Sequence, residues 1–435
     1  MFRFNATRRC FAALALAAIA WSAPLRAAPL DDRVPADAAA YVAWAGTDVL
    51  KGQYATSNLK GILDASTIRE VFEKQWPQVI RQLSGGGVNE KERALAEKWV
   101  NALVHHPTAF YFRSVDLSNP NMPVPSLGFV MDAGADAKDL AALLKDLMDQ
   151  DPAPAPLKVQ LVLDGNFLHL SMGSTDTPDD LKKGGGLAGA AVYKAAMASA
   201  KHPSPAAAVY VDGPKILAMV NDGLAHGPNT PPEVRDRVTK TIDLLGLNGL
   251  TQIAYTTGFE DKAWGEHMFV GIKGPRTGVL AMMGDAPLSD GALAVVPKDA
   301  TTFAAWKMDL HGMFTQVRDL IGRLEPRAQR DIDQALANSK EQSGVDIEKD
   351  LLAPLGDEWV IYRAPSSDGG APSMALVHRL KDANAFAATL AKVETFANNA
   401  LKDSPIKIDK ARAAKTDVST IAVLQYSIAW TVKDG

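Results

Sequence analysis

The stretch VPADAAAYVAWAGTD at residues 34–48 decides the fold, because a close variant, VPKDATTFAAWKMD, returns at residues 296–309. In both copies a proline precedes a short segment that is typical of a β-strand. An aromatic residue then precedes a tryptophan by three positions, and a helical pattern follows. We therefore expect each stretch to open one copy of a duplicated folding unit.

The same order of elements follows both stretches. In the first copy we expect helices over 58–83 and 90–104, strands over 108–115 and 125–133, and a helix over 135–149. A hairpin with its turn at Asp164 and Gly165 closes this copy. The second copy shows the same order and ends at Gly435, so we expect it to lack its last strand.

This pattern predicts an α+β protein with duplicated units, in which mixed, mostly antiparallel sheets pack against long amphipathic helices. We expect a signal peptide over residues 1–27 and a first α+β repeat unit over 28–173. A middle segment with strand–helix and hairpin elements occupies 174–294, and the second repeat unit occupies 295–435. The middle segment contains a strand followed by a helix, which resembles a third, degraded copy of the opening theme.

The first 27 residues have the three parts of a secretory signal. Arg3, Arg8 and Arg9 form a basic start, an apolar run too short to span a bilayer follows, and small residues precede a cleavage point after Ala27. The pair Arg8–Arg9 also fits twin-arginine export, and both routes stay open. No later apolar run is long enough for a transmembrane helix, so we expect a soluble periplasmic or extracellular protein.

Charge and cysteine content exclude several functions. Removing residues 1–27 removes four arginines and no acidic residue, which changes the net charge from −4 to −8. This charge disfavours nucleic acid as a partner. The only cysteine, Cys10, lies in the signal, so the exported chain has neither disulfides nor cysteine-based catalytic or metal sites.

No catalytic or metal-binding signature is present. No two histidines lie three or four residues apart, and GEHM at 265–268 lacks the second histidine of a metalloprotease motif. The chain also lacks a Gly-x-Ser-x-Gly elbow and a phosphate-binding loop. We expect no catalytic residues, no cofactor and no metal site, and an enzymatic activity is disfavoured.

The opening motif offers the only candidate ligand or interface residues, the aromatic side chains Tyr41, Trp44, Phe303 and Trp306. Positions three apart on a strand face opposite sides, so each pair presents one ring to either face of its sheet. We interpret the rings mainly as packing residues, and the alternative is an aromatic surface that binds a ligand. Asp48 and Asp309 are expected to be helix N-caps.

The motif, its repetition and the strands PSLGFVMD and PSMALVHR together resemble an uncharacterised family of exported bacterial proteins. Members of that family carry a duplicated domain of unknown function. The resemblance implies export and duplication, and it supplies no activity or site residue.

We therefore expect a non-enzymatic exported protein that binds a protein partner or an apolar ligand at the cell envelope, in a groove between the duplicated sheets. One alternative is a carboxylate-based envelope hydrolase, which needs two carboxyl groups about 5–10 Å apart across a cleft. The other is a purely structural envelope component.

Overall fold

A computed structural model of the chain divides it into two compact units. Unit 1 comprises residues up to 235 together with 248–275, and unit 2 comprises 236–247 and 276–435. The structure describes residues 30–67, 75, 90–119, 123–150, 153, 155–174, 186–203, 205–227, 230–282, 286–365, 373–413, 416–423 and 426–433. The signal peptide, most of the helix expected over 58–83 and Gly435 lie outside these residues.

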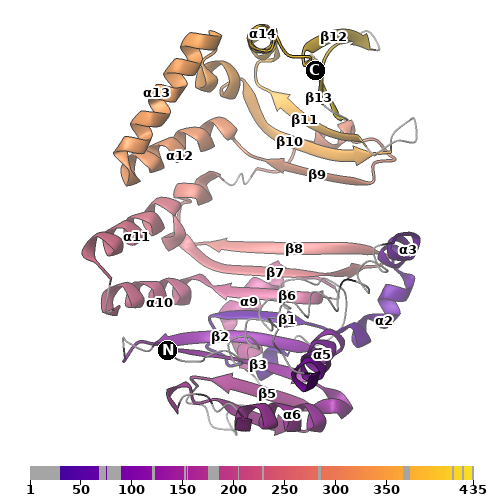
Figure 1. Ribbon diagram of the computed structural model, residues 1–435, viewed down its shortest axis with the longest axis vertical. Coiled ribbons are helices and arrows are strands. Elements are labelled where there is room, and N and C mark those ends of the chain that lie inside the picture. Colours follow the sequence, from indigo (N-terminus) through magenta and orange to yellow (C-terminus); the bar gives the residue numbers. More distant parts are fainter. Residues whose placement is uncertain are drawn as a thin grey trace. The chain divides into compact units, whose positions relative to one another are not determined.

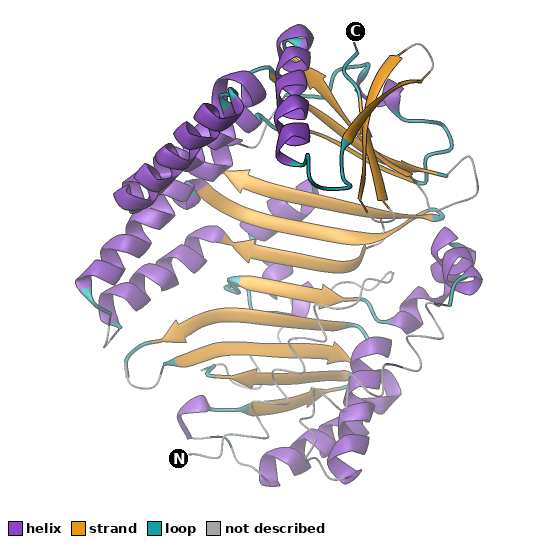
Figure 2. Ribbon diagram, turned by 45° about the horizontal axis from the view of Figure 1, so that its top comes forward, coloured by secondary structure: helices purple, strands orange, loops and turns teal. Residues whose placement is uncertain are grey.

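Unit 1 is built on one eight-stranded sheet with the order β4-β5-β3-β2-β1-β6-β7-β8, in which all neighbours are antiparallel (Figures 1 and 2). Its strands are β1 (Ala40–Trp44), β2 (Thr108–Asp116), β3 (Val124–Asp132), β4 (Gln160–Asp164), β5 (Phe167–Met172), β6 (Pro205–Asp212), β7 (Leu250–Glu260) and β8 (Ala263–Ile272). Its helices are α2 (Thr47–Thr56), α3 (Asn58–Ala65), α5 (Glu90–His105), α6 (Ala137–Gln150), α8 (Gly186–Gly189), α9 (Ala191–Ser199) and α10 (Gly213–His226).

The two faces of this sheet carry separate cores. On one face, Phe129, Leu168 and Leu170 pack with Trp99 of α5 and Leu140 of α6. The other face carries a row of tyrosines from paired strands, covered by α9. Strand alternation places successive residues on opposite faces, and burial of both faces explains why the central strands are so apolar.

Unit 2 contains two three-stranded antiparallel sheets, with the orders β11-β10-β9 and β12-β13-β14. The strands are β9 (Thr302–Lys307), β10 (Leu355–Ala364), β11 (Ser373–Leu380), β12 (Ile408–Ala413), β13 (Thr416–Val423) and β14 (Tyr426–Trp430). The helices are α12 (Leu310–Leu324), α13 (Pro326–Ser343) and α14 (Ala383–Ala400). A further helix, α11 (Pro232–Leu245), begins in unit 1 and continues in unit 2.

The predicted α+β class with mostly antiparallel sheets is confirmed. One order of elements recurs along the chain: a strand, helices, and two strands that pair in sequence. It occurs as β1 to β3, as β6-α10-α11-β7-β8 and as β9-α12-α13-β10-β11, and in each case the three strands are antiparallel neighbours. The degraded third copy expected in the middle segment coincides with the second occurrence, and duplication of the sequence stays a prediction.

The sheet of unit 1 crosses the boundary expected at residue 173, because β1 pairs with both β2 and β6. Strands of the first repeat unit and of the middle segment therefore share one sheet. Among the described residues, β12, β13 and β14 follow α14, whereas β4 and β5 lie between α6 and α8. The expectation that the second copy lacks its last strand stays a prediction.

The two predicted helix caps differ. The Asp309 carboxylate accepts a hydrogen bond from the Gly312 N–H at the start of α12, which confirms it as an N-cap. The prediction for Asp48 is wrong, because α2 begins at Thr47 after Gly46 and Asp48 lies in its first turn. Asp48 lies four positions after Trp44, whereas Asp309 lies three positions after Trp306, and this extra residue moves Asp48 into the helix.

Candidate functional site

Tyr41, the first of the four candidate aromatic residues, is fully buried in unit 1. It lies opposite Tyr111 of β2 and Tyr210 of β6 in the sheet register. The ring of Tyr193 from α9 packs edge-on against Tyr41 at 5.8 Å and against Tyr210 at 5.1 Å between centroids. Burial is the main cause that raises the Tyr41 pKa well above its ordinary value. The structure therefore places Tyr41 among packing residues.

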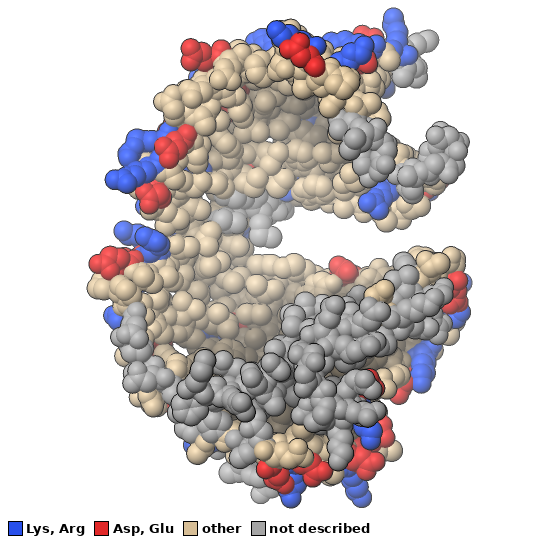
Figure 3. All heavy atoms as spheres, in the orientation of Figure 1, with Lys and Arg blue, Asp and Glu red and all other residues tan. Residues whose placement is uncertain are grey.

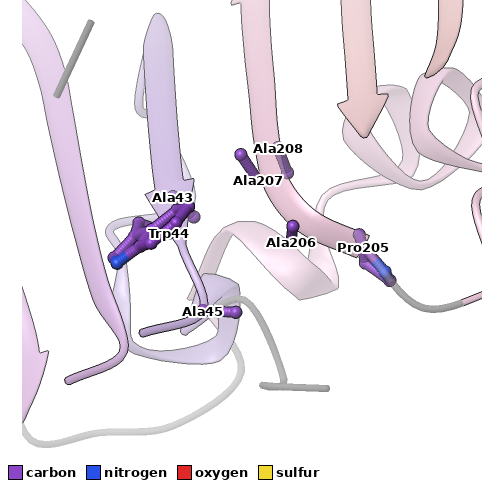
Figure 4. Close-up of a pocket in the computed structure, with 7 residues that line it drawn as sticks. All are labelled: Ala43, Trp44, Ala45, Pro205, Ala206, Ala207 and Ala208. Atoms are coloured by element: carbon purple, nitrogen blue, oxygen red, sulfur yellow. The ribbon is translucent and has the colours of Figure 1, made fainter. Parts of the chain in front are cut away.

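Trp44 lies on the opposite face of β1, where its indole Nε1 donates to the backbone oxygen of Val104 at 3.2 Å. It lines an open hollow beside β1 and β6, whose other lining residues are Ala43, Ala45, Pro205, Ala206, Ala207 and Ala208 (Figure 4). The alanine side chains are too short to fill the space beside the indole. Trp44 supplies the only polar side-chain atom of this lining, so the hollow offers an apolar surface.

The second pair lies in unit 2. Phe303 is 58% exposed, which distinguishes it from the buried Tyr41 at the same place in the motif. Trp306 lies on the other face of β9 and pairs in register with Trp359 of β10. The two indole rings are nearly parallel, with an interplanar angle of 9° and centroids 6.5 Å apart. The indole N–H of Trp359 donates to the backbone oxygen of Met308 at 3.0 Å, which fixes this ring.

Trp306 belongs to a continuous apolar surface. The register places Trp306, Trp359 and His378 in one row across β9, β10 and β11, and the ring centroids of Trp359 and His378 are 3.7 Å apart. Ile361, Leu376 and Met374 extend the same face along β10 and β11. We call these six residues the aromatic face.

The aromatic face is partly open to solvent. Leu376 is 59% exposed and Met374 is 64% exposed, whereas Val360, on the other face of β10, is buried. Burial lowers the pKa of His378, which favours its neutral form in the ring stack. In the view of Figure 3, residues other than Lys, Arg, Asp and Glu make up most of the described surface in the part of unit 2 that contains β9, β10 and β11. The described part of unit 2 therefore presents an exposed apolar sheet face.

A second group of interest lies in unit 1, where His202, Glu260 and His267 meet. Each offers one ligand atom, and these atoms all lie within 4.8 Å of one another. Nε2 of His267 is 2.5 Å from Oε1 of Glu260, and Nε2 of His202 is 3.7 Å from the same oxygen. The His202 side chain is fully buried, whereas those of Glu260 and His267 are each 40% exposed.

The local fold explains this meeting. Glu260 ends β7 and His267 lies in β8, on the face that α9 covers. On the opposite face, Phe259 and Trp264 pack edge-on at 5.4 Å and fix the orientation of the hairpin. Between the two polar residues lies Gly265, where a Cβ atom would come within 2.5 Å of Cδ of Glu260. This glycine leaves the space through which the Glu260 carboxylate reaches His267.

His202 reaches the same place from the loop after α9. The Thr256 hydroxyl donates to the backbone oxygen of Ala200, which ties the end of α9 to β7. The hydrogen bond from His267 is the main cause that lowers the pKa of Glu260, and the charges of His267 and His202 add to it. Glu260 is therefore an anion beside two imidazoles.

Sequence reasoning missed this cluster because it searched for histidines close together on one helix. His202 and Glu260 are 58 residues apart, and only the antiparallel return of β8 brings His267 beside Glu260. Part of the cluster could have been recognised in the hairpin sequence FEDKAWGEH at residues 259–267. There Glu260 and His267 lie on one face of the hairpin, with Gly265 between them. His202 had no such signal.

Three other histidines lie in regular secondary structure. His169 lies in β5 and His378 in β11, and His105 is the last residue of α5. Within the described residues, no helix is long and apolar enough to cross a membrane.

Comparisons with known proteins identify only a family. No curated protein and no solved structure matches the chain. Residues 175–420 match a family described as "Protein of unknown function (DUF3352)", and these residues run from before α8 into β13. Because the match covers more than half of the 435 residues, the chain belongs to this family of uncharacterised proteins.

Proposed function

We propose that this protein is exported and, without catalysing a reaction, binds a protein partner at the cell envelope through the aromatic face of unit 2. The observation that carries the proposal is the exposure of Leu376 and Met374 beside the Trp306–Trp359–His378 stack. Export is supported by the basic, apolar and small-residue parts of residues 1–27.

Burial of the exposed apolar side chains of the aromatic face would stabilise a complex. Fully burying a leucine or methionine side chain contributes about 1.5–3 kcal/mol. Leu376 and Met374 still expose 59% and 64% of their surface, so covering both contributes roughly 2–4 kcal/mol. Exposed apolar patches of this kind mark interaction sites in soluble proteins.

The shape and composition of this surface favour a protein over a small apolar ligand. Small ligands bind in concave pockets that cover most of their surface, whereas one face of a three-stranded sheet is open. Tryptophan, methionine and arginine are enriched in protein interfaces, and Arg363 is exposed on the same face, opposite Met374 in the register. Of the two kinds of occupant that the sequence suggested, we therefore choose the protein partner.

The recurring order of a strand, helices and two strands that pair in sequence supports duplication as the origin of this architecture. Its three occurrences differ in how far their sheets extend. The first two join through β1 and β6 into one sheet, whereas the described sheet β11-β10-β9 has three strands. The hydrolase and the structural component stay predictions, since no contact described above favours either.

The test is site-specific photocrosslinking in intact cells that produce the protein. A photoreactive phenylalanine analogue replaces Leu376, and the matched control carries it at Val317, an exposed apolar residue of α12 in the same unit. We expect one crosslinked protein from position 376 and none from position 317. Equal crosslinking at both positions, or none at 376, would contradict the proposal.

Binding must then be reproduced with two purified proteins. The crosslinked protein is mixed with the full chain, and the affinity is measured by calorimetry for the native sequence, Leu376→Glu and Val317→Glu. A charge at position 376 must stay solvated, so we expect binding to weaken at least about tenfold, which corresponds to about 1.4 kcal/mol. Unchanged affinity for Leu376→Glu would overturn the aromatic face as the binding surface.

A further inference from the structure

We propose that His202, Glu260 and His267 bind a divalent transition metal ion, with Zn²⁺ as the ion that fits them best. The proposal concerns unit 1 and is independent of the aromatic face in unit 2. It rests on three ligand atoms from three segments that lie within 4.8 Å of one another.

The donor set matches the preference of zinc. Two imidazole nitrogens and one carboxylate oxygen form a known three-residue zinc set, which leaves a fourth position for water or an added ligand. Imidazole also suits Cu²⁺ and Ni²⁺, whereas Mg²⁺ and Ca²⁺ prefer sites composed of oxygen atoms. The charge is suitable as well, because the anionic Glu260 offsets half of the charge of the ion.

One ligand–ligand distance is close to the value that the ion requires, and another must change when the ion binds. Ligand atoms about 2.0–2.1 Å from a tetrahedral zinc ion lie about 3.4 Å from one another. The His202–Glu260 distance of 3.7 Å is near this value, and the His267–Glu260 distance of 2.5 Å must lengthen. Glu260 and His267 are the two partly exposed members, so small rotations of their side chains make this adjustment.

The site has one fixed ligand and two accessible ones. His202 is buried at the end of α9, and the hydrogen bond from Thr256 to Ala200 holds this segment on β7. Glu260 and His267 expose part of their side chains and give an ion access from solvent. Packing of Phe259 against Trp264 holds the hairpin that carries both residues. His202 and the hairpin backbone are therefore positioned before an ion arrives, which reduces the ordering cost of binding.

The contact between Glu260 and His267 could also be a simple histidine–carboxylate pair that binds no metal. The chain contains another pair of this kind. His226 contacts Asp222 at 2.8 Å on the exposed surface of α10, and among the residues that the structure describes neither belongs to a cluster of three ligands. This pair has the same chemistry as Glu260 and His267 but lacks a counterpart of His202. It is therefore the matched control for the experiment.

The experiment measures Zn²⁺ binding by calorimetry with the full chain, prepared without a polyhistidine tag and stripped of metal by a chelator. We expect one Zn²⁺ per chain. Replacing a direct ligand, in His267→Ala or Glu260→Gln, should weaken binding by more than the roughly 10–100-fold that outer-shell partners contribute. His226→Ala should bind Zn²⁺ as the native chain does.

Two further measurements exclude trivial results. Circular dichroism must show that each variant is folded, and Gly265→Ala, which keeps all three ligands but crowds the Glu260 carboxylate, should weaken binding to an intermediate extent. Co²⁺ should give the absorption bands of a tetrahedral nitrogen–oxygen site in the native chain and lose them in His267→Ala. Absence of stoichiometric binding, or equal loss in His226→Ala and His267→Ala, would overturn the proposal.

Discussion

A buried carboxylate in unit 2 gives the sharpest prediction about stability. Glu394 of α14 is 6% exposed, and its Oε1 accepts hydrogen bonds from the Ser419 hydroxyl at 2.6 Å and from the Trp430 indole N–H at 2.9 Å. The Lys410 ammonium lies 2.9 Å from Oε2. These three residues belong to β13, β14 and β12, so one side chain ties the whole C-terminal sheet to α14.

We predict that Glu394→Gln lowers the free energy of unfolding of unit 2 by about 2 kcal/mol. A hydrogen bond to a charged acceptor contributes about 1.5–3 kcal/mol, and a neutral one about 1 kcal/mol, so each of the two bonds loses about 1 kcal/mol. The ion pair adds little, because the Lys410 side chain is 66% exposed and solvent screens it.

The pH dependence of this effect has a definite sign. Burial raises the pKa of Glu394, but the hydrogen bonds from Ser419, Lys410 and Trp430 outweigh burial and leave the pKa below its ordinary value. A carboxylate with a lowered folded-state pKa stabilises the fold above its unfolded pKa of about 4.3, and this stabilisation is lost as the pH falls through the folded value. The difference between native chain and variant should therefore be full at pH 7 and shrink below about pH 4.

The assay is urea unfolding followed by circular dichroism, with the exposed Glu341→Gln of α13 as the control. With a slope of about 2 kcal/mol per molar urea, the predicted loss moves the midpoint of the transition of unit 2 by about 1 M. Equal midpoints for Glu394→Gln and Glu341→Gln at pH 7, or a difference that grows toward pH 3, would refute the reasoning.

Two further predictions concern local stability. Burial lowers the pKa of His169 to about 4, so the unfolded chain binds more protons than the folded chain below pH 6.5, and about 3 kcal/mol of stability is lost between pH 6.5 and pH 4. Urea titrations at several pH values should show that His169→Leu loses less stability over this range than the native chain. Asp309→Ala should cost about 1 kcal/mol by removing the N-cap of α12. Asp48→Ala should cost less than about 0.5 kcal/mol, because its contacts with Lys51 and His105 are exposed to solvent. Thermal unfolding compares the two variants.

Local periodicity predicted most elements well. α5, α6, α12, α13 and α14 lie where the spacing of apolar residues indicated helices. Periodicity did not indicate α11, whose sequence PEVRDRVTKTIDLL is rich in charged residues. It also did not indicate β12, because the segment IDKARA carries three charges. β12 pairs with β13 and contacts α14, and the periodicity of a single segment cannot show such pairing.

The functional surfaces were harder to predict because they depend on long-range packing. Tyr41 and Phe303 occupy the same motif position, yet Tyr193 of α9 covers the first and Phe303 remains 58% exposed. The aromatic face needed Trp359 and His378 beside Trp306, which only strand pairing supplies. The His202 cluster likewise needed α9 to end above the β7–β8 hairpin.

The most direct test of the proposed function compares methionine oxidation in the purified protein and in the native cell envelope. Met374 on the aromatic face is 64% exposed, and Met268 on β8 is 65% exposed, so the two methionines are matched in accessibility. Mass spectrometry after brief oxidation should find both modified equally in the purified chain and Met374 selectively protected in the envelope. An unchanged ratio of Met374 to Met268 oxidation in the envelope would contradict the claim that the aromatic face binds a protein partner.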